Sequence, residues 1–97
     1  MIPADVEAFV LRNFPSCDVP QALQILDRAV DQTDSRAKPR LLRCAAIASG
    51  NTLSGLKYQV DGLAIDYRDV ILAAEYIRQK GEFVRVRDFF QPISDDA

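Results

Sequence analysis

The sequence predicts an all-α, mainly helical protein, with about five amphipathic helices packed around a central apolar helix at residues 39–49. Apolar residues recur at helical spacing through most of the 97 residues. Within residues 41–48 only Arg43 is polar, and a helix that is apolar on nearly every side must be covered on nearly every side. Pro39 suits a first helical position, and Gly50 suits the residue after a last turn.

Two amphipathic helices are predicted before the central one, over residues 4–14 and 19–32. Acidic residues occupy the first turn of the first helix, where the helix dipole favours negative charge. Asp18 is placed to cap the second helix. The expected core-facing stripes are Val6, Phe9, Val10 and Phe14 in the first helix, and Ala22, Leu23, Leu26, Ala29 and Val30 in the second.

A fourth helix is predicted to begin after Asn51-Thr52 and to end near Asp61, with Gly62 at its C-terminal cap. Gly55 weakens this prediction, because glycine within a helix costs about 1 kcal/mol relative to alanine. An alternative stays open, because Asp61-Gly62 between short alternating segments is also a hairpin signal for residues 58–65.

The fifth predicted helix has Asp66 as its N-cap and extends to Lys80, where Arg78 and Lys80 would complement the helix dipole and Gly81 would follow. Its apolar stripe comprises Tyr67, Val70, Ile71, Ala74 and Ile77.

Residues 83–90 are predicted to form an extended arm, because Phe83 to Arg87 alternate with a period of two. A single strand has no partner in a helical chain. It must therefore pack as an arm, pair with a misassigned segment near 58–65, or pair with another chain. Residues 1–92 are expected to form one helical domain, with a disordered tail at 93–97.

Composition excludes several classes of function. The chain has no histidine, so the Cys–His pair, the Ser–His–Asp triad and histidine metal sites are excluded, and we expect no metal and no cofactor. Cys17 and Cys44 are not expected to pair. The longest apolar run, residues 44–48, is too short to span a membrane, and no signal peptide is evident, so a cytoplasmic protein is expected.

The first function hypothesis is a non-enzymatic protein-interaction or regulatory adaptor. The arm offers apolar side chains and unpaired backbone groups to a protein partner or to a second copy in a homodimer. The candidate partner-binding residues are Phe83, Val84, Val86, Phe89 and Phe90. A small enzyme that uses carboxylates, tyrosines or Cys17 stays open as a further class.

The alternative hypothesis is nucleic-acid or anion binding by basic clusters at residues 36–43 and 78–87. Cations at a helix N-terminus oppose its dipole, which an anionic partner would offset. The structural explanation is that Arg40 and Arg43 pair with Asp27, Asp31 or Asp34, and that the later arginines keep an exposed edge from aggregating. Convergence of the two clusters would favour the anion hypothesis. The candidate anion-binding residues are Arg36, Arg40, Arg43, Arg85 and Arg87.

Overall fold

The computed structural model describes residues 2–32 and 39–93, and this part of the chain is mainly helical, as predicted. It forms four helices and a two-stranded antiparallel sheet. The elements are α1 (Ala4–Asn13), α2 (Val19–Gln32), α3 (Pro39–Ala48), α4 (Leu53–Glu75), β1 (Tyr76–Gln79) and β2 (Glu82–Arg85). None of the helices in the described residues is both long and apolar enough to cross a membrane.

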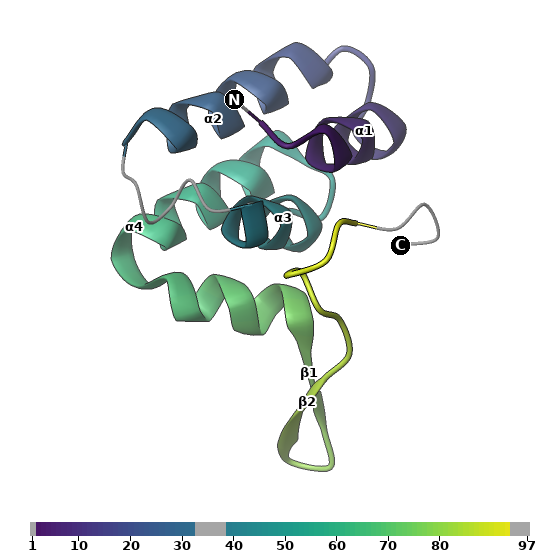
Figure 1. Cartoon of the computed structure of the whole chain (residues 1–97), viewed down its shortest axis with the longest axis vertical. Helices are drawn as coiled ribbons and strands as arrows, with labels where there is room; N and C mark the ends of the chain where they lie inside the picture. The colour runs from purple at the N-terminus through teal and green to yellow at the C-terminus, as the bar shows by residue number, and fades with distance from the viewer. Residues whose placement is uncertain (1, 33–38, 94–97) are drawn as a thin grey trace.

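The helices form a layered body from which the hairpin of β1 and β2 projects (Figure 1). Helix α3 packs against α4 and α1, and α2 packs against α1 and α4. After β2, the chain turns back along the end of α4 towards the helices (Figure 1). The hairpin is therefore held to the body at both ends, by α4 before it and by the returning segment after it.

The core contains the predicted stripes of the first two helices, apart from partly buried Leu23 and Val30. Residues 41–46 of α3 are all buried, including Arg43. Helix α4 adds Leu56, Leu63, Val70 and Ala74, and the returning segment adds Phe89 and Ile93. Ile93, which was expected in the disordered tail, is buried, and its amide donates to Asp5 at 3.1 Å. Residues 94–97 lie outside the described part.

Helix α4 joins the fourth predicted helix to the first part of the fifth, so the described residues contain four helices and not about five. The predicted boundary is nevertheless visible as a break at Asp66, where the backbone leaves helical geometry (φ −156°, ψ 101°). Its carboxylate accepts a hydrogen bond from the amide of Arg68 at 3.1 Å, as an N-cap does. The hairpin alternative for residues 58–65 is wrong, because these residues are helical.

Gly62 and Gly55 both allow another part of the chain to approach α4 closely. Gly62 is not a C-cap; a Cβ there would lie 3.2 Å from Cγ2 of Val70, across the break. At the start of α4, Thr52 accepts from the amide of Gly55 at 3.0 Å. A Cβ on Gly55 would lie only 1.8 Å from the carbonyl oxygen of Ser49. The glycine that weakened the helix prediction is required by this turn.

The end of the fifth predicted helix was wrong. Helix α4 ends at Glu75, and residues 76–79 form β1, which supplies the strand partner that the sequence did not reveal. Lys80 and Gly81 have positive φ values of 51° and 81°, so they form the two-residue turn of a hairpin and not the end of a helix. Tyr76 and Ile77 are residue types that favour strands. The turn allows them to pair with Arg85 and Val84 of β2.

Candidate functional site

The β1–β2 hairpin is the candidate functional site, and its register decides which side chains share a face. Cross-strand neighbours are Tyr76 with Arg85, Ile77 with Val84, Arg78 with Phe83, and Gln79 with Glu82. Because neighbours across a sheet and residues two apart lie on one face, the aromatic and cationic residues Tyr76, Arg78, Phe83 and Arg85 share one side. The guanidinium of Arg78 lies 6.0 Å from the ring centre of Phe83. Ile77 and Val84 lie on the other side.

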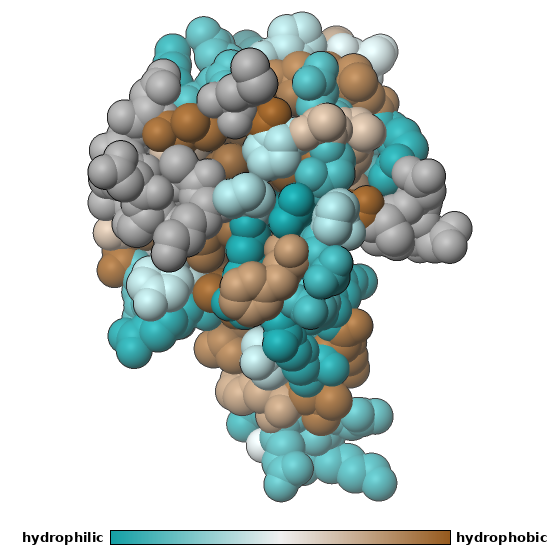
Figure 2. All heavy atoms as spheres, viewed as in Figure 1, coloured by the Kyte–Doolittle hydropathy of each residue, from teal (hydrophilic) through white to brown (hydrophobic). Residues whose placement is uncertain are grey.

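Both faces of the hairpin present apolar side chains to solvent. The exposed fractions are 60% for Phe83, 46% for Ile77, 38% for Val84 and 47% for Val86, which follows β2. Figure 2 shows apolar residues gathered on the projecting part, with hydrophilic residues at its tip. A two-stranded hairpin has too little core to bury such residues by itself. This surface is therefore apolar, and it stands away from the helices.

The hairpin ends in a β-bulge that directs the chain back towards the body. The carbonyl of Glu75 accepts hydrogen bonds from the amides of both Val86 and Arg87, at 2.7 and 3.2 Å. Two residues opposite one define a bulge, which bends and twists the strand. The guanidinium of Arg87 donates to the carbonyl of Ala74 at 3.2 Å and holds the same bend.

The side chain of Glu75 is the anchor of this bend. It is fully buried, and Arg40 donates to both of its oxygens at 2.9 Å. Arg85 lies 3.0 Å from its Oε1, and the amide of Phe89 donates to its Oε2 at 3.3 Å. One carboxylate therefore joins the first turn of α3, the end of α4, the strand β2 and the returning segment. The base of the hairpin is fixed by these contacts.

Electrostatics keep Glu75 ionised in this buried position. Burial raises the pKa of the carboxyl group, but the hydrogen bonds from Arg40 and Phe89 and the charges of Arg40 and Arg85 outweigh it, so the pKa lies below its ordinary value. Cys44 donates from Sγ to Oε2 at 3.6 Å, and burial and the charge of Glu75 raise its pKa to about 12. Cys44 is therefore a protonated thiol in the core and not a nucleophile.

A second ion pair ties the returning segment to α1. Arg43 donates from Nε to Asp5 at 2.7 Å and from Nη1 to the carbonyl of Phe89 at 3.1 Å. Burial raises the pKa of Asp5. The hydrogen bond and charge of Arg43 and the hydrogen bond from the amide of Ile93 lower it by more, so the pKa lies below its ordinary value. The segment after the hairpin is thus held by two buried or half-buried acidic groups.

The predicted partner-binding residues are divided between surface and core. Phe83, Val84, Val86 and Phe90 are exposed, whereas Phe89 is buried and anchors the returning segment. Phe90 lies on the body side of the hairpin, where the guanidinium of Arg40 is 4.0 Å from its ring centre. Three of the four exposed candidates, Phe83, Val84 and Val86, therefore lie on β2 or directly after it.

The two predicted basic clusters converge, but around acidic groups. Arg40 and Arg85 meet at Glu75, and Arg85 also contacts Asp88 at 2.9 Å. Arg43 pairs with Asp5. Among the described side chains, the acceptors of both α3 arginines come from α4 and α1 and not from the expected Asp27. The side chain of Asp31 and residue Asp34 lie outside the described part. Arg36 lies outside the described residues. Anion binding by these side chains stays a prediction.

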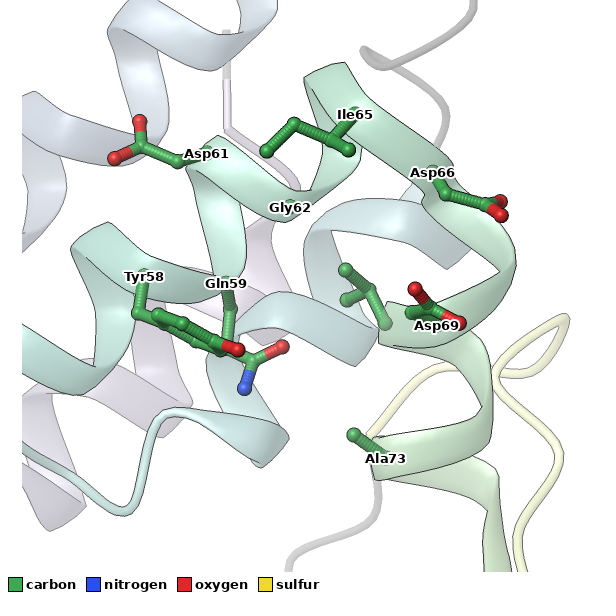
Figure 3. A pocket seen from close by; sticks show the side chains of 9 residues that line it. Tyr58, Gln59, Asp61, Gly62, Ile65, Asp66, Asp69 and Ala73 are labelled. Carbon is green, nitrogen blue, oxygen red and sulfur yellow. The ribbon is translucent and has the colours of Figure 1, made fainter.

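The concave side of the break in α4 holds a pocket of about 400 Å³ (Figure 3). Apolar atoms of Ile65, Val70 and Ala73 line it, together with Tyr58 and three carboxylates. Asp66 is already engaged by Arg68. Within residues 2–32 and 39–93, no group of three His, Cys, Asp or Glu side chains is arranged to hold a metal ion. The pocket is therefore an open apolar hollow with an acidic rim.

Glu75 and Asp5 are the important residues that the sequence analysis missed. Asp5 was assigned to the first turn of the first helix, and Glu75 fell inside the fifth predicted helix, with no reason to expect burial of either. The signal that could have found Glu75 is indirect: two arginines on the buried helix at residues 39–49 require buried acceptors. The strand β1 also had a signal, since Lys-Gly between Tyr-Ile-Arg-Gln and Glu-Phe-Val-Arg separates two runs of strand-forming residues by two positions.

A small helical body with a projecting, ion-anchored hairpin is the class of structure that these observations define. No protein-family model, no curated protein and no solved structure shows a significant match to this chain. The function is therefore inferred from the geometry alone.

Proposed function

We propose that this chain is a non-enzymatic protein-interaction module that presents the β1–β2 hairpin to a protein partner. The observation that carries the proposal is the exposure of Ile77, Phe83 and Val84 on a hairpin whose base is fixed by buried Glu75. Apolar residues that project together from a body with its own core are typical of interaction surfaces.

The anchoring supports a binding role for the hairpin. A flexible arm would lose conformational entropy on binding, whereas a hairpin already held at both ends loses less. The contacts of Glu75 with Arg40 and Arg85 hold it at one end, and those of Arg43 with Asp5 hold the segment that follows it. Two free thiols, Cys17 and buried Cys44, suit a reducing compartment such as the cytoplasm.

Nucleic-acid binding is the weaker candidate. The guanidinium groups of Arg40, Arg43 and Arg85 each contact a carboxylate, so the point where the clusters converge carries little net positive charge. An anion would have to displace those carboxylates before it could bind.

The experiment is capture of partners by the tagged chain, with and without nuclease, using matched surface variants. Phe83→Ser removes the most exposed apolar side chain of the hairpin, and Leu11→Ser removes a comparably exposed one, 58% accessible, from α1. Helical circular dichroism checks that both variants fold. We expect a partner that is retained by the Leu11→Ser variant and with nuclease, and lost by the Phe83→Ser variant. Equal capture by both variants would contradict the proposal, and capture that nuclease abolishes would favour nucleic acid.

A further inference from the structure

We propose that the partner of the hairpin is a second copy of this chain, which pairs antiparallel along β2 about a two-fold axis at Val84. This inference rests on the proposed function, since it names the occupant of the same surface. It would join two hairpins into one four-stranded antiparallel sheet.

The register shows which backbone groups β2 offers at its free edge. In an antiparallel pair, hydrogen-bonded and non-hydrogen-bonded pairs alternate. The amide of Val86 donates to the carbonyl of Glu75, so this is a hydrogen-bonded position, and so is Val84 with Ile77 two residues earlier. Phe83 and Arg85 are then the residues whose N–H and C=O groups point away from β1. They form a template for another strand.

The edge of β2 is better suited to pairing than the edge of β1. On β1, the amide of Tyr76 points outward by the same alternation. It already donates a hydrogen bond to the carbonyl of Leu72 at the end of α4. The outer edge of β1 therefore has one donor fewer than the edge of β2, and it begins directly at a helix. On β2, Phe83 and Arg85 keep both donors and both acceptors facing outward.

Three two-fold registers can be compared on this edge. A centre at Phe83 would place Arg85 opposite Gly81, whose φ of 81° belongs to the turn and cannot pair as a strand. A centre at Arg85 would place two arginines directly opposite each other, which is destabilising. A centre at Val84 pairs Phe83 with Arg85 of the second copy in both directions, and so uses all the outward groups of both residues.

The side chains are self-complementary in this register. On one face, a row across the four strands reads Tyr76, Arg85, then Phe83 and Arg78 of the second copy, so aromatic and cationic side chains alternate. On the other face, the central row reads Ile77 and Val84, then Val84 and Ile77 of the second copy. Four β-branched side chains would shield one another from water, and no like charges stand directly opposite.

The first test uses charge exchange at the two-fold position. Val84 is 38% exposed on the hairpin, so Val84→Glu and Val84→Lys leave the body intact, as circular dichroism checks. In either variant alone, like charges face each other across the axis, and we expect dimerisation at least about tenfold weaker by analytical ultracentrifugation. An equimolar mixture of the two variants places opposite charges together and should restore a species of twice 10.8 kDa. A mixture that stays monomeric overturns the register.

The second test is a site-specific cross-link in a Cys17→Ser background, with Cys44 buried. Val84→Cys places two thiols in a non-hydrogen-bonded pair with Cα atoms about 4.5 Å apart, within disulfide range. Phe83→Cys is the matched control, since its Cα would lie about 8 Å from its own copy, beyond that range. With a mild copper–phenanthroline oxidant, we expect covalent dimer from Val84→Cys and at least about tenfold less from Phe83→Cys. Equal cross-linking of both overturns the two-fold axis at Val84.

The outcomes separate this inference from the proposed function. A chain that is monomeric at millimolar concentration, but that captures a different protein through Phe83, overturns the second copy as partner and leaves the interaction module standing. A dimer unaffected by the Val84 substitutions also overturns the inference, because it must use another face. A monomer that captures nothing through Phe83 overturns both.

Discussion

Arg40 and Glu75, which are 35 residues apart in the sequence, form a two-bond fork with both distances at 2.9 Å. The fork joins the first turn of α3 to the last residue of α4. It explains an arginine at the start of a helix, where the dipole is unfavourable, because a buried carboxylate offsets that repulsion. It also fixes the point at which the hairpin leaves the body.

Removal of the negative charge at Glu75 should therefore destabilise the fold. Glu75→Gln keeps the shape but leaves Arg40 and Arg85 without their shared counter-charge. These arginine side chains are 24% and 39% exposed, so water partly solvates their charges. We therefore expect the free energy of unfolding to decrease by about 2–3 kcal/mol. Glu82→Gln, on the exposed strand β2, is the control and should change it by less than about 0.5 kcal/mol. Chemical denaturation measures both. Similar values for the two variants would argue against the anchor.

Stability should fall in acid as the carboxylates of Glu75 and Asp5 become protonated. The pKa values of Glu75 and Asp5 are lowered by the fold from ordinary values of 4.5 and 3.8. A group with a lowered folded pKa contributes its full stabilisation above the unfolded value, and loses it as pH falls through the folded value. The free energy of unfolding should therefore decrease below about pH 4.5. In urea titrations from pH 7 to pH 3, the Glu75→Gln/Asp5→Asn variant should show a smaller decrease. Parallel curves for variant and wild type would exclude these two groups as the cause.

Local sequence signals predicted the helices well and the C-terminal third poorly. Periodicity and caps located α1, α2 and α3 because each buries one stripe or lies in the core, and Asp66 was correctly placed as a cap. The strand β1 was missed because Tyr76 and Ile77 also continue the apolar stripe of α4, so helical period and strand propensity competed over the same residues. The two-residue turn at Lys80 and Gly81, where both φ values are positive, favours the strand.

Contacts between distant residues set the rest of the candidate site, and a single sequence does not encode them visibly. Arg40 and Arg43 had nearer acidic residues in the chain, at positions 27, 31 and 34. Their actual acceptors are chosen by how α1, α3 and α4 pack. The strand conformation of Phe83 and Val84 followed from alternation, whereas the burial of Phe89 required knowledge of the path back to the core.

The hairpin turn should respond in opposite directions to two substitutions. Gly81→Ala puts a Cβ at φ 81°, which costs about 1–2 kcal/mol. Lys80→Asn, at φ 51°, creates the Asn-Gly pair that this turn prefers, and should stabilise the hairpin by several tenths of a kcal/mol or more. Hydrogen exchange of the Ile77 and Val84 amides, which face each other across the strands, measures the change. Amides in α1 should be unaffected by either variant, which provides the internal control. Faster exchange in both variants would contradict the turn geometry.

Gly55 should be intolerant of any side chain, although it lies within a helix where alanine is normally favoured by about 1 kcal/mol. A Cβ there would lie 1.8 Å from the carbonyl oxygen of Ser49, which is backbone and cannot move aside as a side-chain end can. The turn between α3 and α4 would have to shift, and the amide of Gly55 would lose its bond to Thr52. We expect Gly55→Ala to lower the free energy of unfolding by about 3 kcal/mol. Ser54→Ala, at the exposed neighbouring position, is the control and should change it by less than about 0.5 kcal/mol in the same denaturation experiment. If Gly55→Ala were neutral or stabilising, the packing of this turn would be wrong.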